Sequence, residues 1–545
     1  MFKRTTLCLL AAAMTLSMAA GLTSCKPNDT TGEGEGTYGR YDKEVHFTTV
    51  RQAVTDPKMP DGMTLADNPY VDFMKKELNV TYEVLWEDSM YNDKLLLDLT
   101  SGTLPDVFVV NDYRTYQLLY DSDLLADLTD VYDQHAWQEM KDIYNSYGDR
   151  MLSPVTEGGR LMALPSTSNG YQEALLWVRK DWLDALGLQE PKTIEEIASV
   201  ARQFVAQDPG GNGKGNTVGI AYNREHSFTG YRQSYGLEPV ANSMNAFPKQ
   251  WMQNDAGEIY YGSIQPEFKQ VLGLTRSWIE SGVLDESFME ASWETIYDSV
   301  ISGRAGMWFF PWNWAYESQF IEKNPRAELS VYPAPLDANG KATYATGVPF
   351  ESMLCVRKGY EHPEVIFKVI HLWHDMYNGV HQEGYDALEP TREMDTVWYY
   401  IAPMGTYDYR YDNTIQRDTE KLKDYVDNGV EPEPFSPAAR TRFDRVKSWI
   451  ENQDTSANWS EYMTRYVASE QEYAPECNPV HPVFFFQTDT MIDQWDNLLS
   501  MERDMIRTIL NGEEALDSFD QFVEDWRTAG GDQITKEVAE FVSEH

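Results

Sequence analysis

The clearest structural signal in this chain is Ser101-Gly102-Thr103-Leu104-Pro105-Asp106-Val107-Phe108-Val109-Val110-Asn111-Asp112. A helix predicted over residues 88–100 stops at the glycine, and a buried strand is predicted from Pro105 to Val110. The strand ends at the polar pair Asn111 and Asp112. Because ligands of open α/β sheets collect at the carboxyl ends of strands, we expect this pair at a binding edge. Capping of the following helix is the alternative role for both residues.

Strands with the same character precede this stretch. Apolar strands are predicted over residues 45–50 and 80–86, with an amphipathic helix between them. Arg51 and Trp86 stand at the ends of these two strands. We therefore expect both side chains at the same edge of the sheet as Asn111.

The alternation of strands and helices continues downstream. A strand is predicted over residues 174–178 and a helix over 180–186, and a capping box of Thr193 and Glu196 begins the next helix. Further strands and helices lead to an apolar strand at 304–310, and the last third of the chain is mainly helical. This alternation is typical of an α/β protein.

Composition limits the classes of function. The 545 residues are 42% hydrophobic and 24% charged, which fits a chain of about two to four domains. Lysine and arginine number 45 against 87 aspartates and glutamates, so the net charge is −42 and binding to nucleic acid or anionic lipid is disfavoured. The 16 Trp, 33 Tyr and 22 Phe suggest a stacking surface in addition to cores, while 9 His and 4 Cys disfavour an enzyme rich in transition metals.

The N-terminus is predicted to be a lipoprotein signal peptide over residues 1–24. An apolar stretch at 7–18 follows two basic residues, and Leu22-Thr23-Ser24-Cys25 forms a lipobox. A signal peptidase would cleave before Cys25 once its sulfur carries diacylglycerol; an ordinary signal peptide with an incidental cysteine is the alternative. Residues 25–44, rich in Gly, Thr, Asn, Glu and Pro, are predicted to be a flexible tether. No later run approaches the ~20 apolar residues of a membrane helix.

Further motifs follow in a fixed order along the chain. They are Leu124-Leu125-Ala126-Asp127-Leu128, Trp177-Val178-Arg179-Lys180-Asp181-Trp182-Leu183, Pro191-Lys192-Thr193-Ile194-Glu195-Glu196, Gly303-Arg304-Ala305-Gly306-Met307, Pro311-Trp312-Asn313-Trp314 and Ile534-Thr535-Lys536-Glu537-Val538. Together with the lipobox and the 101–112 stretch, this set resembles the extracellular solute-binding proteins of carbohydrate ABC importers, in family 1 with the maltodextrin-binding proteins. The resemblance covers essentially the whole chain after the signal peptide.

The resemblance implies a periplasmic-binding-protein-like type II fold, in which two α/β lobes joined by a hinge enclose an interlobe ligand cleft. Lobe 1 would hold residues 45–165 and 347–396, and lobe 2 would hold residues 166–346 and 397–545. Cys355 and Cys477 would then lie on different lobes, where a disulfide would hinder opening, so free thiols are favoured.

The resemblance also suggests which residues contact a sugar. Aromatic rings cover the apolar face of a sugar, and polar side chains bond its hydroxyl rim. Trp312 and Trp314 match a family motif that supplies stacking rings; one of them is expected in the cleft, and Trp312 is favoured. The residues expected to contact ligand are Arg51, Trp86, Asn111, Asp112, Tyr171, Trp312, Trp314 and Glu351. Packing in a core is the alternative role for the aromatic members.

Residues 208–216 resemble a calcium loop found in some relatives. Asp208, Asn212 and Asn216 would supply oxygen ligands, but the third position is Gly210 and the twelfth is Gly219. We therefore expect a glycine-rich turn that has lost the ion, and no cofactor.

These observations predict a non-catalytic protein anchored by lipid outside the cytoplasmic membrane. It would capture a neutral oligosaccharide by lobe closure and deliver it to ABC transporter permease subunits. We expect a monomer that touches the membrane through its lipid anchor only and binds no nucleic acid. The alternatives are a surface glycoside hydrolase, whose carboxylate pair cannot be singled out among 87 acids, and a peptide-binding member of the same fold.

Overall fold

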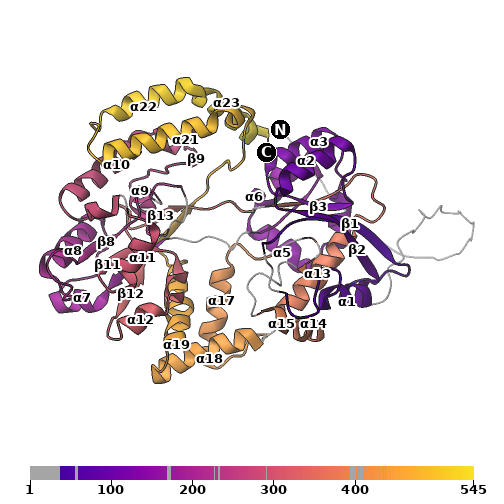
Figure 1. Ribbon diagram of the computed structural model, residues 1–545, viewed down its shortest axis with the longest axis horizontal. Coiled ribbons are helices and arrows are strands. Elements are labelled where there is room, and N and C mark those ends of the chain that lie inside the picture. Colours follow the sequence, from indigo (N-terminus) through magenta and orange to yellow (C-terminus); the bar gives the residue numbers. More distant parts are fainter. Residues whose placement is uncertain are drawn as a thin grey trace, which may run out of the picture.

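Two hydrophobic cores organise the chain into two lobes (Figure 1). The computed structural model describes residues 37–544 except 56–58, 168–173, 226, 231–233, 290, 351, 393–400, 403, 405–408, 434 and 436. The core of lobe 1 draws its side chains from residues 41–164 and 350–409. The core of lobe 2 draws them from residues 174–334 and 459–538.

Lobe 1 is built on short strands that converge from distant parts of the chain. They are β1 (Val45–Gln52), β2 (Val80–Asp88), β3 (Val107–Val110), β6 (Leu164–Pro165) and β14 (Met353–Val356). β1 and β2 pair in parallel, and β14 lies antiparallel between β3 and β6. The hydroxyl and backbone N–H of Thr48 both donate to Asp106, which fixes β1 beside the start of β3. The chain therefore returns to lobe 1 after leaving it, as the resemblance implied.

The stretch at 101–112 folds as its sequence indicates. Helix α2 (Tyr91–Ser101) ends at Gly102, whose φ of 72° is in the left-handed region that favours glycine. β3 follows and is buried, and α3 (Tyr113–Asp121) begins directly after Asp112. The predicted helix and strand are confirmed, with ends that differ by one to three residues.

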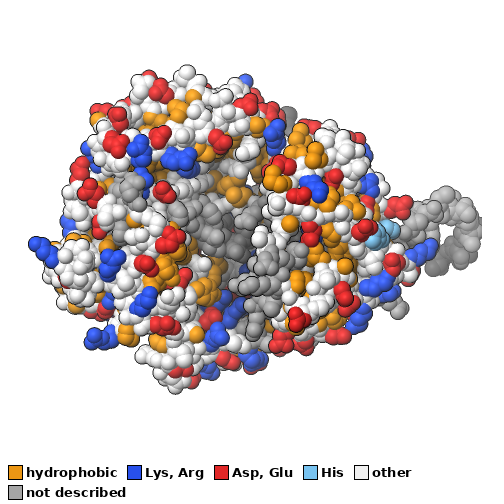
Figure 2. Space-filling model, in the orientation of Figure 1, with side chains coloured by type: hydrophobic (Ala, Val, Ile, Leu, Met, Phe, Trp, Pro, Cys, Tyr) orange, Lys and Arg blue, Asp and Glu red, His pale blue; other side chains and the backbone are white. Residues whose placement is uncertain are grey.

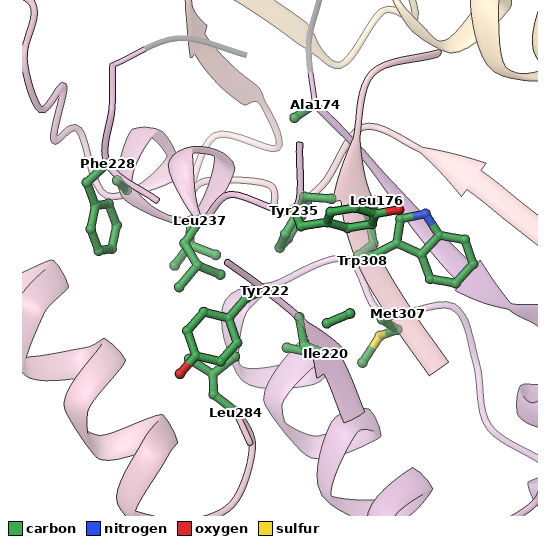
Figure 3. Close-up of a cluster of buried hydrophobic side chains, with 14 of the residues drawn as sticks. Ala174, Leu176, Ile220, Tyr222, Phe228, Tyr235, Leu237, Leu284, Met307 and Trp308 are labelled. Carbon is green, nitrogen blue, oxygen red and sulfur yellow. The ribbon is translucent and has the colours of Figure 1, made fainter. Parts of the chain in front are cut away.

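Lobe 2 contains a four-stranded sheet in the order β12-β7-β11-β8. Its strands are β7 (Leu175–Arg179), β8 (Val218–Ala221), β11 (Ala305–Phe310) and β12 (Leu329–Tyr332). β11 runs parallel to β8 and antiparallel to β7. Side chains from these strands and from the connections around them, among them Ile220, Tyr222 and Trp308, fill the core (Figure 3). The capping box of Thr193 and Glu196 begins α8 (Ile194–Gln207) as predicted.

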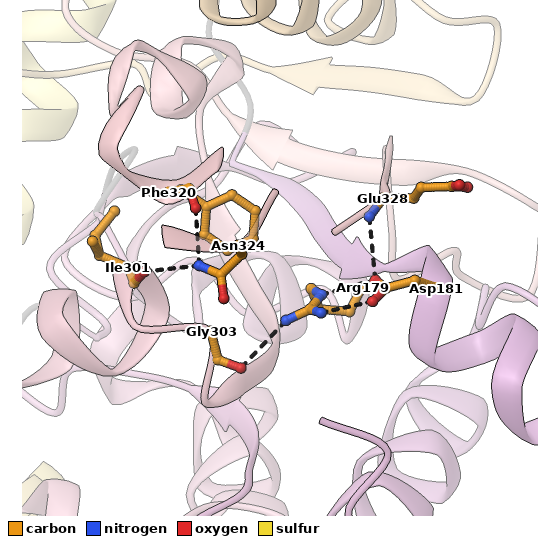
Figure 4. A network of polar contacts seen from close by, with 7 residues as sticks. All are labelled: Arg179, Asp181, Ile301, Gly303, Phe320, Asn324 and Glu328. Atoms are coloured by element: carbon orange, nitrogen blue, oxygen red, sulfur yellow. Dashed lines mark hydrogen bonds and ion pairs between the residues drawn. The ribbon is translucent and has the colours of Figure 1, made fainter. Parts of the chain in front are cut away.

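A polar network ties the ends of these strands together (Figure 4). The Arg179 guanidinium donates to Asp181 at 2.6 and 2.8 Å and to the Gly303 carbonyl at 3.3 Å. Gly303 has a φ of 79°, and a Cβ there would lie 2.0 Å from the side-chain oxygen of Asn324. Only glycine fits this turn, which explains why the motif at 303–307 begins with one.

The long C-terminal helices complete lobe 2 and also reach lobe 1. They are α21 (Asp489–Leu510), α22 (Ser518–Trp526) and α23 (Asp532–Glu544) (Figure 1). The ring of Tyr113 in α3 stacks on Phe486 with centroids 4.1 Å apart and meets the edge of Phe541 of α23 at 5.5 Å. Aromatic packing therefore joins the two lobes.

Other segments pass between the lobes. β13 (Ala342–Ala345) pairs in parallel with β15 (Cys477–Val480), and α17 (Thr414–Lys423) follows a segment that contacts lobe 1. Ile401, Ala402, Met404 and Tyr409 pack in the core of lobe 1. By packing, these four residues belong with lobe 1, although the sequence analysis assigned them to lobe 2.

The last residues of the predicted tether are also folded. Residues 38–42 lie on lobe 1, and the side chain of Tyr41 is buried there. In the part of the chain that the structure describes, no helix combines the length and the apolar character needed to cross a membrane.

Candidate ligand-binding site

The carboxyl ends of β1, β2 and β3 place four of the predicted residues on lobe 1. Asn111 is exposed at the end of β3. Asp112 accepts a hydrogen bond from the backbone N–H of Thr115 at 2.8 Å, so its carboxylate caps α3. Asp112 thus has the alternative role, capping of the helix. Asn111 is the member of the pair that is exposed at the carboxyl edge of the sheet.

Arg51 and Trp86 are engaged with lobe 1 itself. Arg51 is 5% exposed and lies near the hydroxyls of Tyr82 and Tyr91, where its charge opposes the rise in their pKa values that burial causes. The indole N–H of Trp86 donates to Asp98 at 2.7 Å, and the ammonium of Lys94 lies 4.7 Å from its ring centroid. In this conformation Arg51 is buried within lobe 1, and Trp86 is partly exposed and held by contacts within lobe 1, so contact of either side chain with ligand stays a prediction.

The two tryptophans after β11 have different environments. Residues 312–316 form a 3-10 helix instead of a strand end. Trp314 is 1% exposed, donates from its indole to the Tyr235 hydroxyl at 3.1 Å, and packs on Trp308 at 4.5 Å. Its burial corrects the prediction that it contacts ligand, because no ring face is left for a sugar.

Trp312 is partly buried and packs against the core of lobe 2. Its backbone N–H donates to Glu472 at 3.1 Å, and its indole N–H has no acceptor among the described residues. The ring meets Tyr316 at 6.1 Å and the guanidinium of Arg465 at 5.8 Å. The residue is therefore fixed through its backbone, and its ring is only partly exposed, with the indole nitrogen buried. The other two predicted contacts, Tyr171 and Glu351, lie outside the described residues.

A cavity of about 190 Å³ lies beside Trp312 and shares Glu472 with it. It opens between the β13–β15 pair and the start of α17. Acidic and basic side chains are both scattered over the face of the molecule seen in Figure 2. The residues that line it are Tyr344, Asp412, Asn413, Ile415, Gln416, Glu472, Tyr473, Ala474, Cys477 and Pro479. Two phenol rings, two carboxylates and two amides thus surround one small space.

Contacts from both lobes hold the segment that enters this cavity. The backbone N–H of Arg410 donates to the Thr167 hydroxyl at 2.7 Å, and that of Asp412 donates to the Ser146 hydroxyl at 3.0 Å. A few residues later, the Thr419 hydroxyl of α17 donates to Ser469 at 2.8 Å. The cavity therefore lies next to a segment that is bound to both lobes.

The chemistry of the lining suits a hydroxylated ligand. Phenol rings offer apolar faces, and carboxylates and amides bond to hydroxyls in both directions. Burial raises the pKa of Tyr473 to about 12, so its hydroxyl stays a neutral donor. No lysine or arginine is among the described lining residues. Arg465, whose guanidinium lies near the Trp312 ring, donates to Glu461 at 3.0 Å, and that carboxylate also faces Arg445 at 3.7 Å.

The lining residues of α17 and the segment before it were not predicted. They lie at no predicted strand end and beside no glycine turn, the two patterns used to predict site residues. Only tertiary packing brings them close to Trp312. The density of tyrosine, aspartate and asparagine at 407–413, Tyr407-Asp408-Tyr409-Arg410-Tyr411-Asp412-Asn413, is the one sequence feature that could have indicated them.

The calcium-like loop is satisfied by its own hydrogen bonds. The two oxygens of Asp208 accept from the backbone of Asn212 at 2.9 Å, from that of Gly213 at 2.8 Å and from the Thr217 hydroxyl. A Cβ on Gly210 would lie 2.4 Å from the ring of Trp182, so no ligand side chain fits at the third position. The loop as it stands therefore does not fit a calcium ion. Among the described residues, no group of three His, Cys, Asp or Glu side chains gathers to hold a metal.

Neither described cysteine is in a disulfide. Cys355 is buried in β14, where burial raises the pKa of its thiol, and Cys477 lies in β15 at the cavity.

Known proteins share sequence and fold with this chain. Residues 56–372 match the family described as bacterial extracellular solute-binding protein. The chain is 21% identical over 473 residues, 86% of each protein, to the polygalacturonan/rhamnogalacturonan-binding protein YtcQ of Bacillus subtilis. It is 20% identical over 280 residues, 49% of each, to the fructooligosaccharide ABC transporter substrate-binding protein FusA of Streptococcus pneumoniae.

Solved structures of such proteins share the fold. The HMO-binding, ABC-transporter-associated solute-binding protein of Bifidobacterium longum infantis aligns with a TM-score of 0.61 at 14% identity, covering 92% of this chain and 99% of its own. FusA in complex with kestose aligns with a TM-score of 0.54 at 16% identity, over 92% and 99%. The predicted type II periplasmic-binding-protein-like fold is confirmed.

Proposed function

This chain belongs to the bacterial extracellular solute-binding proteins, and from that membership we propose that it captures a neutral oligosaccharide for an ABC importer. The sugar would enter between the lobes, the lobes would close on it, and the closed protein would deliver it to the permease subunits. The protein itself would carry out no chemical step.

The observation that carries this proposal is the junction of Trp312 with the polar cavity. The Glu472 carboxylate holds the Trp312 backbone and lines the cavity, so a stacking ring and a hydrogen-bonding rim are fixed side by side. A sugar needs both, because one of its faces is apolar while its edge carries hydroxyls.

Charge supports a neutral sugar over an acidic one. The described lining holds Asp412 and Glu472 and no basic side chain, and the whole chain carries a net charge of −42. Both features oppose the approach of an anion. The named ligands of the relatives include polygalacturonan and fructooligosaccharide, which differ in charge, so the argument rests on this chain's own residues.

A lipid anchor at Cys25 completes the proposal. Support comes from the lipobox at residues 22–25 and from the similarity to the Bacillus subtilis protein called lipoprotein LipO, 22% identical over 260 residues. Cys25 itself lies outside the described residues.

Titration of the purified protein with a panel of neutral oligosaccharides, followed by tryptophan fluorescence and by melting temperature, tests the proposal. At least one glycan should raise the melting temperature, as any ligand that binds only the folded state does. No response to any glycan would contradict it. Release of shorter products from a labelled oligosaccharide would instead favour the glycoside hydrolase alternative, and a response to peptides alone would favour the peptide-binding one.

A further inference from the structure

Four residues at the N-terminal end of the described chain, Tyr38-Gly39-Arg40-Tyr41, lie along helix α13 (Val365–Asn378) of lobe 1. We call them the strap. The Tyr38 hydroxyl donates to Asp375 at 2.9 Å, and its ring meets the edge of His371 with centroids 5.1 Å apart. Tyr38 is thus held at both its ring and its hydroxyl.

Tyr41 repeats this mode of binding near the start of α13. Its hydroxyl donates to Glu364 at 2.8 Å, and its ring meets His362 at 5.7 Å. Its backbone N–H also donates to the Leu78 carbonyl at 3.0 Å. Burial and the nearby carboxylates raise the pKa of both strap tyrosines, which keeps their hydroxyls protonated as donors.

Lys368 of α13 binds the backbone of the strap between the two tyrosines. Its ammonium donates to the carbonyls of Gly39 at 2.8 Å and Tyr38 at 3.3 Å, and it lies 5.1 Å from the ring centroid of Tyr41. Gly39 has a φ of 65°, and a Cβ there would lie 2.5 Å from this ammonium. The left-handed backbone at Gly39 favours glycine, and the absence of a side chain leaves room for the Lys368 ammonium.

The composition of residues 25–44 predicts a flexible tether, yet this segment ends in residues that are bound to lobe 1, with Tyr41 buried there. A passive linker would not need these contacts. We infer that the strap fixes the exit of the N-terminal segment on lobe 1, so that lobe 1 lies closer to the membrane than lobe 2. This inference rests on the proposed lipid anchor at Cys25. From Cys25 to Tyr38 the chain can span at most about 45 Å, at roughly 3.5 Å a residue. Without the strap the free length would extend to Val45, which adds about 25 Å.

Energy transfer from the protein to vesicles tests which lobe is near the membrane. The full-length lipidated protein, with Cys477→Ser to remove the accessible thiol, carries a donor dye on Gln134→Cys in lobe 1 or on Lys214→Cys in lobe 2. Both positions are exposed. The vesicles are phosphatidylcholine with an acceptor-labelled lipid. Transfer should be greater from residue 134 than from residue 214, and Tyr38→Ala/Tyr41→Ala should reduce the difference, because the chain would then leave lobe 1 at Val45 on a longer tether.

Amide exchange checks the strap independently of the membrane. The Tyr41 amide should be protected in the parent protein, and protection should fall by about tenfold or more in Tyr38→Phe/Tyr41→Phe, which removes only two hydroxyls. Asp42→Asn, at an exposed neighbour, is the matched control and should leave protection unchanged. Equal transfer from both lobes of vesicle-bound protein would overturn the inference, as would an unprotected Tyr41 amide. Absence of the parent protein from the vesicles would overturn the proposed lipid anchor and this orientation with it, while Tyr41 exchange would still decide whether the strap is held.

Discussion

The carboxylate of Glu472 accepts a hydrogen bond from the backbone N–H of Trp312 at 3.1 Å, although 160 residues separate them. Glu472 is 5% exposed, so this bond is shielded from water. It fixes the turn after β11 to the helical region that lines the cavity. A ring that could stack on a sugar and the groups that could bond its hydroxyls therefore keep one relative position.

Replacing Trp312 with alanine should weaken oligosaccharide binding by about 1–3 kcal/mol, the scale for loss of one well-packed aromatic contact. Titration calorimetry gives the dissociation constant. Trp314→Phe is the control: Trp314 is in the core, so this variant should melt at a lower temperature and keep its affinity. Unchanged affinity with reduced stability in Trp312→Ala would assign Trp312 to the core as well.

Chelation with EDTA should hardly change the melting temperature, because the Asp208 carboxylate is already satisfied by Asn212, Gly213 and Thr217. Asp208→Ala should lower the melting temperature equally with and without EDTA, since it removes those bonds from the loop. A fall of many degrees in the parent protein on adding EDTA would show that the loop rearranges to bind calcium.

Glu238 should make stability fall as pH rises. The side chain is 3% exposed, accepts two bonds from Thr229, and has its second oxygen unpaired among the described residues. Burial raises its pKa from 4.5 to about 7. The folded state therefore holds this proton more tightly than the unfolded state, so the stabilisation is complete below about pH 4.5 and is lost as pH rises through 7.

Glu238→Gln cannot ionise and should remove this loss. The variant should gain stability over the parent between pH 5 and pH 8, by up to about 3 kcal/mol. Thermal unfolding of both proteins at the two pH values measures the difference. An equal gap between the two proteins at both pH values would show that Glu238 does not titrate in this range.

Cys25→Ala should leave a folded protein that still binds ligand but is released from the membrane. The lipid on Cys25 is the only attachment that the sequence predicts. Fractionation of cells that express the parent and the variant checks this. A variant that stays in the membrane fraction would refute the lipobox interpretation.

The sequence predicted what local patterns determine. The helix stop at Gly102, the buried strand before Asn111 and the capping box at Thr193 depend on neighbours in the chain, and all three are present. Trp314 is in the core and Trp312 is only partly buried because residues 312–316 form a 3-10 helix; in a strand, two residues two apart would share one face.

The cavity and the strap could not be predicted in the same way. Glu472 meets Trp312, and Tyr38 meets Asp375, only after long segments have packed together. Residues 38–42 were predicted to be tether from their composition. Composition does not show that the hydroxyls of Tyr38 and Tyr41 each bond to a carboxylate, on α13 and at its N-terminus.

Titration calorimetry with neutral oligosaccharides and with oligomers of a uronic acid, each at low and at moderate salt, tests the central claim most directly. The acidic, hydroxyl-bonding lining beside Trp312 predicts that a neutral oligosaccharide binds and that its dissociation constant changes little with salt, since screening acts on charged ligands. Tight binding of the uronic acid oligomer that collapses as salt is added, with no binding of any neutral glycan, would contradict the account.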